Sequence, residues 1–368
     1  MYIIMMKTRK VEYAIAETMS QYFGENLFPL FEVIKDEYIP RYKQDPLTGK
    51  ILYEIKDGNR KRTRIRLFDK EEDRVTLQKI NNTISGRTAF IDFHRYGSIK
   101  AKGHLKENDS VLPLQLAGDF RLYGERLQEV TDYPNLIAVV SIMKKPEDDK
   151  NDVLKLLQTL KTTGHPIAVR ISINKFEEYE RMLSEYLQNS DYLMIDIDMK
   201  KISSLQPTFR IIRQSRVQGT LVLLSSPRNS NINNRDYETE GYTDLIDCSG
   251  CSEYLRLGFD GFGDFGGLKN VLPSGSGGRG GSALALLYNH NINKYLSIRN
   301  ANPNIGTKGY SDVIARIMQR RAELDPDHDC PAIKIIDGLM QTNKPGNWQT
   351  WIGITLARSI HQQYKRFS

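Results

Sequence analysis

Apolar segments of strand length recur along the chain and alternate with segments whose apolar residues are spaced three and four apart. This alternation predicts repeated strand–helix units around a parallel sheet. Continuous apolar runs such as Ile167–Ile173 suit strands covered on both faces, as the strands of a parallel sheet are. We predict eight strands, at Tyr2–Met6, Phe28–Ile34, Ala89–His94, Leu136–Ile142, Ile167–Ile173, Tyr192–Asp198, Thr220–Ser225 and Thr243–Asp247.

Amphipathic helices are predicted between several of these strands, because apolar residues fall on one face at helical spacing. A chain of 368 residues has room for a barrel of roughly 250 residues and an accessory region. The predicted fold class is therefore α/β, a (β/α)8 TIM-like barrel, with an open doubly wound sheet as the alternative. The predicted helices are Lys10–Tyr22, Glu71–Ile84, Asp152–Thr162, Lys175–Gln188 and Ile202–Arg216.

Two stretches interrupt the alternation. The first, Ile39–Phe68, has polar strands around turn-forming residues and predicts a β-hairpin insertion. The second is rich in glycine and leads into a hairpin at Ala283–Tyr288 and Lys294–Arg299, followed by helices. The predicted organisation is a barrel over 1–257 with its insertion at 38–68, a Gly-rich loop over 258–282, and a C-terminal α+β appendage over 283–368.

Composition adds limits to this picture. The hydrophobic fraction of 39% and charged fraction of 26% are those of an ordinary globular protein. Three cysteines are too few for a disulfide framework, so we expect a reducing compartment and a cytoplasmic location. The apolar start at Met1–Met6 is followed at once by Lys7 and is too short for a membrane span or a signal sequence, so no membrane contact is expected.

Candidate chemistry lies where polar residues end otherwise apolar strands, because the C-terminal strand ends of a barrel build its site. Strand alternation places Asp92 with His94, and Asp196 with Asp198, on shared faces. Buried carboxylates need a cation, a shared proton or an arginine such as Arg170. The candidate mouth residues are Glu32, Asp92, His94, Arg170, Asp196, Asp198 and Ser225.

Two interpretations of this mouth stay open. In the first, acid–base catalysis falls to Asp92, His94, Asp196 and Asp198, while Glu32, Arg170 and Ser225 bind substrate, with Arg170 on an anionic group such as phosphate. Glu32, Asp92, Asp196 and Asp198 are then also candidate ligands for Mg²⁺ or Mn²⁺. In the second, the same residues form a structural ion-pair network around Arg170.

The net charge of +7 is concentrated in patches, of which the hairpin insertion carries the densest. Alternating arginines on one strand predict a surface that contacts nucleic acid or a partner protein. A charged strand edge that resists aggregation explains the same pattern. The residues of this patch are Arg60, Arg62, Arg64 and Arg66.

Several short motifs together resemble the beta-protein family of bacterial and phage proteins. They are Met1–Lys10 with Glu12-Tyr13, Phe28–Glu32, Phe90–Phe93, Asp196-Ile-Asp198 and Gly261–Phe265. The resemblance spans most of the chain and implies a barrel fold and a place in a mobile-element or phage-defence locus. It supplies no catalytic assignment.

Two functions follow as hypotheses. The first is a barrel whose acidic, arginine-containing mouth binds a phosphorylated or nucleotide ligand and hydrolyses it with a divalent metal, as a metal-dependent hydrolase or phosphodiesterase. The second is a non-catalytic sensor or scaffold subunit that binds a partner protein encoded nearby or nucleic acid. Both are placed in an anti-phage defence or mobile-element locus by the family resemblance.

Overall fold

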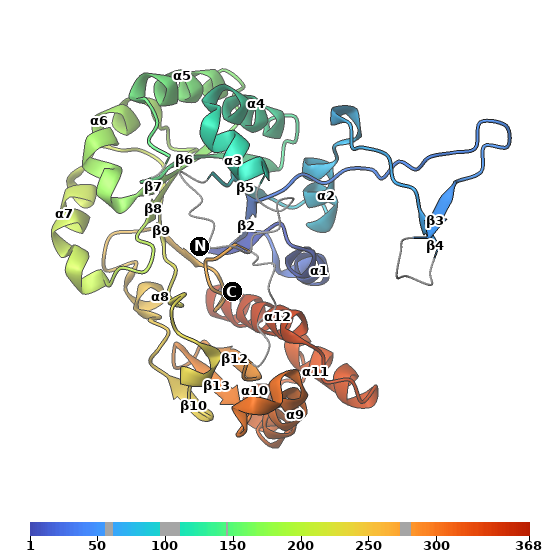
Figure 1. The fold of residues 1–368 in the computed structure, drawn as a ribbon. Helices are drawn as coiled ribbons and strands as arrows, with labels where there is room; N and C mark the ends of the chain where they lie inside the picture. Colours follow the sequence, from blue (N-terminus) through green and yellow to red (C-terminus); the bar gives the residue numbers. More distant parts are fainter. Residues whose placement is uncertain (56–61, 96–110, 145, 273–280) are drawn as a thin grey trace.

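A closed barrel of eight parallel strands forms the body of the protein in a computed structural model, which describes residues 1–55, 62–95, 111–144, 146–272 and 281–368. The strands follow the order β1-β11-β9-β8-β7-β6-β5-β2 around the barrel (Figure 1). The predicted TIM-like barrel is confirmed. Its strands are β1 Tyr2–Lys7, β2 Leu27–Val33, β5 Ala89–Phe93, β6 Leu136–Ile142, β7 Ile167–Ser172, β8 Tyr192–Asp196, β9 Thr220–Leu224 and β11 Gly261–Asp264.

The eighth barrel strand differs from the prediction. It is β11, which pairs with β1 and β9, whereas the predicted strand at Thr243–Asp247 is not part of the barrel. Glycines made this segment look like a loop, but they are needed for close packing. A Cβ on Gly263 would lie 2.7 Å from Ile3 O and 2.7 Å from Leu224 Cδ2. The predicted Gly-rich loop is therefore wrong over Gly261–Asp264, and the barrel extends beyond its predicted boundary at 257.

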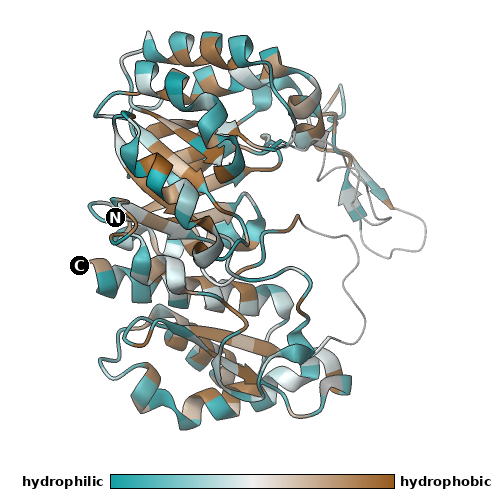
Figure 2. Cartoon of the chain, turned by 90° about the vertical axis from the view of Figure 1, so that its left-hand side faces the viewer, coloured by the Kyte–Doolittle hydropathy of each residue, from teal (hydrophilic) through white to brown (hydrophobic). Residues whose placement is uncertain are grey.

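Helices cover the outside of the barrel, and hydrophobic residues concentrate on the strands that they enclose (Figure 2). The five predicted helices are present, four of them with shorter bounds and α5 beginning two residues earlier than predicted. Helices α3 and α4, between β5 and β6, were not predicted. Among the described helices none is long and apolar enough to cross a membrane. The outer helices are α1 Lys10–Thr18, α2 Thr76–Thr83, α3 Val111–Gly118, α4 Phe120–Val130, α5 Lys150–Lys161, α6 Phe176–Tyr186, α7 Gln206–Gln214 and α8 Ser249–Glu253.

A small antiparallel sheet lies beside the barrel and forms the predicted appendage. Its strands β10 (Glu240–Thr243), β12 (Leu284–Asn289) and β13 (Lys294–Arg299) follow the order β10-β13-β12. The predicted hairpin is confirmed by the antiparallel pairing of β12 with β13. Helices α9 (Tyr310–Gln319), α10 (Arg321–Leu324) and α11 (Pro331–Gln341) complete the appendage.

Helix α12 (Trp348–Phe367) lies between the barrel and the appendage (Figure 1). It packs against α1, β1 and β2 on one side and against β12 and α11 on the other. Burial on both sides explains why its central residues, 353–363, are all buried, as in a helix enclosed by its neighbours. Its assignment to the appendage alone is therefore wrong, because α12 also covers the first strands of the barrel.

An extended arm, described over residues 38–55 and 62–68, projects from the barrel after β2 (Figure 1). Strands β3 (Tyr53–Ile55) and β4 (Arg62–Arg64) pair antiparallel within it, which confirms the predicted β-hairpin insertion. A separate turn at 45–50, before β3, is held locally, because Asp45 accepts hydrogen bonds from the backbone N–H of Leu47 at 2.9 Å and of Thr48 at 2.8 Å.

Candidate active site

The guanidinium of Arg170 is the centre of the candidate site. From β7 it donates through Nη1 to Glu32 Oε1 at 2.7 Å and to Asp92 Oδ2 at 2.8 Å. It donates to Asp196 Oδ2 through Nε at 2.9 Å and through Nη2 at 2.6 Å. The three carboxylates come from β2, β5 and β8, so barrel closure brings them together as the strand pattern predicted. We call these four residues the Arg170 cluster.

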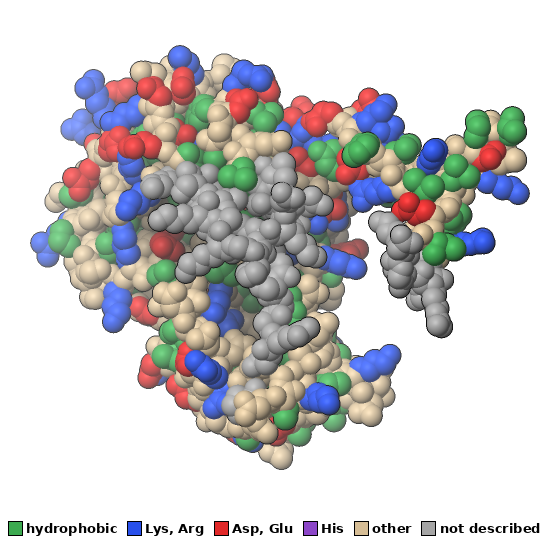
Figure 3. Space-filling model, in the orientation of Figure 1, with side chains coloured by type: hydrophobic (Ala, Val, Ile, Leu, Met, Phe, Trp, Pro, Cys, Tyr) green, Lys and Arg blue, Asp and Glu red, His purple; other side chains and the backbone are tan. Residues whose placement is uncertain are grey.

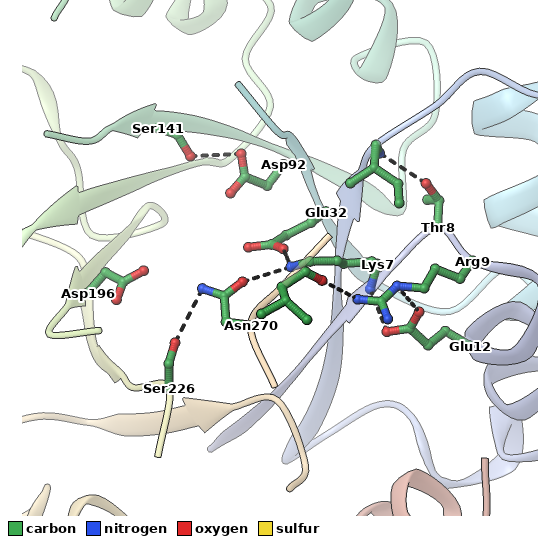
Figure 4. Close-up of polar contacts among 12 residues, drawn as sticks. Lys7, Thr8, Arg9, Glu12, Glu32, Asp92, Ser141, Asp196, Ser226 and Asn270 are labelled. Carbon is green, nitrogen blue, oxygen red and sulfur yellow. Dashed lines mark hydrogen bonds and ion pairs between the residues drawn. The ribbon is translucent and has the colours of Figure 1, made fainter. Parts of the chain in front are cut away.

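Lys7, the last residue of β1, extends the cluster toward the loop after β11. Its ammonium forms an ion pair with Glu32 and donates to Asn270 Oδ1 at 2.8 Å. Asn270 in turn donates to Ser226 Oγ at 3.4 Å, which connects β1 to the end of β9. Figure 4 shows Lys7 between Glu32 and Asn270, with Ser226 on the far side of the amide.

Burial makes the charges of this cluster energetically expensive. Lys7, Glu32, Asp92, Arg170 and Asp196 are each at most 4% exposed, and three carboxylates face only two cations. An ion taken out of water loses its solvation, and only close, well-oriented partners repay that loss. Such a cluster is weak grounds for stability by itself, and replacement by apolar residues of similar volume is often neutral.

The two carboxylates that share Arg170 Nη1 differ in their ionisation. Burial raises the pKa of Glu32, but Lys7 and Arg170 outweigh it and hold that pKa well below its usual range. Burial also raises the pKa of Asp92, and there the cations do not outweigh it, so the pKa stays above its ordinary value. Glu32 is therefore the permanent anion of the pair, and Asp92 is the carboxyl group that gains a proton more readily.

A small cavity of about 60 Å³ opens beside the cluster. It has room for a few water molecules or for the reacting end of a ligand. Arg95 closes one side, where it forms a two-bond ion pair with Asp148 at 2.7 and 2.6 Å. The lining residues are Asp92, His94, Arg95, Ser141, Met143, Pro146, Arg170 and Asn270.

Two predicted site residues lie elsewhere. Asp198 does not share a strand face with Asp196, because β8 ends at Asp196 and Asp198 has a φ of 52°. Its side chain is exposed, and only its backbone N–H reaches Asp196, at 2.7 Å. Ser225 lines a separate hollow of about 30 Å³ with Asp198, whereas its neighbour Ser226 faces Asn270. Adjacent residues point in opposite directions here, so the serine facing the site is the second one.

Three residues of the site were missed in the sequence. Lys7 ends an apolar strand, which is the same signal that identified Asp196, but it was interpreted only as a charge that follows an apolar start. Ser141 donates to Asp92 Oδ1 at 2.7 Å from within β6, where one small polar residue in an apolar strand gives little signal. Asn270 follows β11 and could not be placed while that strand was interpreted as a loop.

Metal binding by Glu32, Asp92, Asp196 and Asp198 stays a prediction. Within the described ranges, no group of three or more His, Cys, Asp or Glu side chains is arranged to hold an ion. Each carboxylate oxygen of Glu32 and Asp92 already accepts from a donor on Lys7, Arg170 or Ser141. A Mg²⁺ or Mn²⁺ ion would have to replace one of these donors.

The arginine patch lies on the arm, away from the barrel mouth. Arg62 and Arg64 are exposed on β4, and Arg64 lies 5.3 Å from the ring of Tyr42. Arg66 is paired with Asp69 at 2.7 Å. Arg60 lies outside the described residues. Contact of this patch with nucleic acid or a partner stays a prediction.

His94 offers a direct check on the site. Burial lowers its pKa to about 4, so the imidazole is neutral at physiological pH. The unfolded chain takes up this proton near pH 6.5, so stability is complete above that pH and is lost as pH falls toward about 4. We expect His94→Gln to flatten the fall in urea midpoint between pH 7 and pH 5. The imidazole resonance of His94 is identified as the one that is absent from His94→Gln. If that resonance titrated near pH 6.5 in the wild type, the lowered pKa of His94 would be contradicted.

Comparison with known proteins places the chain in a family. The sequence model of a family described as Beta protein matches residues 2–365. No curated protein matches the chain. Among solved structures, D-psicose 3-epimerase with D-tagatose from Clostridium cellulolyticum H10 is similar over 72% of this chain and 83% of its own, with 11% identity and a TM-score of 0.34.

Proposed function

This chain belongs to the Beta protein family, and we propose that it is an enzyme whose barrel mouth transfers a proton to or from a small polar ligand. One observation carries the proposal. Of the three carboxylates on Arg170, only Asp92 is among the described lining residues of the cavity, while Glu32 and Asp196 contact the guanidinium without lining it. Asp92 is therefore the carboxyl group placed to meet a ligand.

The surroundings of Asp92 support a proton-transfer role. Ser141 and Arg170 hold its two oxygens in a fixed direction, which orients the group before a ligand arrives. Its pKa is raised while that of Glu32 is lowered, the divergence by which a site obtains one fixed anion and one exchangeable proton. Lys7, Arg170 and Asp196 act as positioning residues in this proposal.

The reacting end of the ligand is proposed to be a hydroxyl or carbonyl group. Four of the five N–H donors of Arg170 already bind carboxylates, so a phosphate there would lie against three anions. Neutral His94 and the Asn270 amide line this cavity, and uncharged polar side chains of this kind suit such uncharged groups. Hydrolysis of a phosphorylated or nucleotide ligand fits if the phosphate lies outside this cavity and the bond that breaks lies inside it. Asp92 then takes a proton from water, the water oxygen bonds to the reacting carbon of the ligand, and Asp92 returns the proton to the oxygen or nitrogen that leaves. Mg²⁺ or Mn²⁺ would be an optional addition.

The test is a ligand screen followed by one isosteric substitution. Neutral hydroxylated metabolites, sugar phosphates and nucleotides are screened by thermal shift, with and without Mg²⁺ and Mn²⁺, and each ligand found is assayed for turnover. We expect Asp92→Asn to reduce the rate by about 10²–10⁴-fold, because general acid–base groups contribute on that order. The stability of the variant should be retained, because the carboxylates of Glu32 and Asp196 still balance the two cations of the cluster.

The control for this experiment is Asp132→Asn, which changes an exposed carboxylate away from the mouth. It should keep both the rate and the melting temperature of the wild type. Full activity in Asp92→Asn would refute proton transfer by Asp92. Ligand binding without turnover in the wild type would leave a binding protein and refute the enzyme.

A second function, partner binding by the arm, is favoured by a separate observation. Apolar side chains are unusually exposed along it, among them Leu47 at 93% and Phe68 at 96%. Figure 3 shows green hydrophobic side chains beside blue cationic ones on the projecting arm. Large exposed apolar groups mark protein interfaces more than nucleic-acid interfaces, so we propose a partner protein encoded nearby, as in a defence or mobile-element assembly.

Copurification with the products of neighbouring genes tests this second proposal. We expect Tyr53→Ser, Ile55→Ser and Phe68→Ser together to abolish association while the melting temperature is unchanged, because these side chains contact solvent in the free protein. Leu255→Ser removes an apolar side chain that is 67% exposed elsewhere on the surface and serves as the control. Equal association of both variants would rule out the arm as the interface.

A further inference from the structure

A groove lies between the rim of the barrel and the appendage, outside the Arg170 cluster. Its volume is about 230 Å³, and a neighbouring hollow of about 200 Å³ shares Arg9, Trp348 and Ile352 with it. Pockets for small ligands begin at roughly 300 Å³, so the two hollows together are of that size. The groove is lined chiefly by Arg9, Arg228, Leu268, Lys269, Tyr310, Trp348 and Trp351.

The groove is positively charged. Arg9, Arg228 and Lys269 line it, and none of its described lining residues is Asp or Glu. Arg228 donates to Gly267 O at 3.0 Å and to Asn234 Oδ1 at 3.2 Å, which are both neutral acceptors. Its Nε is buried and has no hydrogen-bond partner within the described ranges. Part of the guanidinium is therefore unsatisfied, although the group is held in place.

Lys269 lies beside Arg228 and, like it, donates only to neutral acceptors among the described residues. Its ammonium donates to the backbone oxygens of Ser230 at 3.1 Å and of Ile232 at 2.7 Å, and no ion pair joins it to a described carboxylate. Burial and the neighbouring Arg228 both lower its pKa, against the opposing effect of Asp236, so the two cations repel each other. Two adjacent cations that form no ion pair with a described carboxylate favour a bound anion that would neutralise both.

Aromatic side chains form the other part of the groove. Tyr310 and Trp351 stack with ring centroids 4.9 Å apart and planes 6° from parallel. The indole N–H of Trp351 donates to Pro345 O at 2.9 Å, which holds the stacked pair in one orientation along one side of the groove. Trp348 is 48% exposed on the border of both hollows and offers a free ring face.

We propose that this groove binds a phosphorylated ligand that carries an aromatic ring, the chemical class of the mononucleotides. The phosphate contacts Arg228 and Lys269, and the ring stacks on Trp348. Guanidinium and ammonium groups are the common phosphate donors of proteins, and indole faces stack on every base. The inference does not depend on proton transfer at the mouth, because it uses none of the Arg170 cluster.

The chain carries its own probe for this site. It has two tryptophans, and both of them line the groove. Intrinsic tryptophan fluorescence therefore reports on the groove alone. Titration with AMP is expected to quench this fluorescence with saturation below about 1 mM, and adenosine and inorganic phosphate are each expected to bind at least tenfold more weakly.

Four variants separate the contributions. Arg228→Met and Lys269→Met should each weaken AMP at least tenfold by calorimetry, whereas Lys269→Arg should keep most of the affinity. Trp348→Leu removes a half-exposed ring without disturbing the core, and should weaken AMP about tenfold while phosphate binding is unchanged. Arg181→Met, which alters an arginine 92% exposed on the barrel surface, is the matched control.

Each outcome decides the proposal. Unchanged AMP affinity in both Arg228→Met and Lys269→Met would overturn the phosphate site. Phosphate binding as tight as AMP would overturn the aromatic part, as would unchanged AMP affinity in Trp348→Leu. Absence of any quenching by AMP up to 1 mM would overturn the whole inference, and if the cation variants failed to fold, Trp348→Leu would carry the decision.

Discussion

Replacing Arg170 with methionine is expected to lower the free energy of unfolding by about 3–5 kcal/mol at pH 7, because it leaves buried carboxylates without their cation. Glu32 would keep Lys7, but Asp92 and Asp196 would lose the only ion pair that the described residues give them. Urea denaturation followed by circular dichroism measures this loss, with an unchanged dependence on urea concentration expected if the fold is retained.

The loss should depend on pH in a definite direction. Burial raises the pKa of Asp92 even beside Arg170, and without that cation the pKa rises further. A folded-state pKa above the unfolded one near 3.9 means that the folded state binds more protons, so acid favours folding. The difference between variant and wild type should therefore shrink as pH falls from 7 toward 4.

The control is Arg181→Met, which removes an arginine that is 92% exposed and paired with Glu185 one helical turn away. Exposed pairs of this kind contribute about 0.3–0.5 kcal/mol. If Arg170→Met were as stable as Arg181→Met at pH 7, the Arg170 cluster would not hold buried charges in the way described.

Gly263→Ala is expected to destabilise the barrel by about 3 kcal/mol, a large effect for one methyl group. The new Cβ would lie 2.7 Å from Ile3 O and 3.0 Å from Ile3 Cβ on one side, and 2.7 Å from Leu224 Cδ2 on the other. Two of these three atoms belong to the neighbouring strand β1 itself, so they cannot rotate away. Relief requires β11 to move away from β1, at the seam where the barrel closes.

A glycine-to-alanine substitution at another position is expected to raise the free energy of unfolding, and it serves as the control. An added Cβ on Gly338, an exposed position in α11, meets no atom within 4 Å. Gly338→Ala should stabilise the protein by about 0.5–1 kcal/mol, since alanine favours helix and restricts the unfolded chain. Equal urea midpoints for Gly263→Ala and the wild type would contradict the packing argument.

One short loop connects the two proposed sites. Lys269 lines the groove, Asn270 reaches Lys7 in the mouth, and Val271 O accepts from Arg9 at 2.7 Å. Three consecutive residues thus bear on both sites. A ligand that repositions Lys269 would shift Asn270, and through it the ammonium of Lys7. Occupancy of the groove is therefore expected to change the position of Lys7 in the mouth.

The pattern along the chain was sufficient for the barrel class, for seven of its eight strands and for most of its charged centre. Alternating strand and helix periods are local properties, and parallel strands that close into a barrel must bring their C-terminal ends together. Glu32, Asp92, Arg170 and Asp196 could therefore be predicted as neighbours from the position of each within its own strand. Asp198 could not be placed by the same rule, because alternation no longer applies once the strand has ended.

Tertiary structure alone decided the rest, because it depends on contacts between distant segments. The glycines of β11 have the local signal of a loop, and only their fit between β1 and β9 makes them a strand. The eighth strand in turn brings Asn270 to Lys7, and α12 joins the appendage to the barrel. The groove combines Arg9, Arg228 and Trp348, and no local period relates positions so far apart in the chain. A sequence pattern encodes how each segment folds, whereas closure of the barrel determines which segments meet.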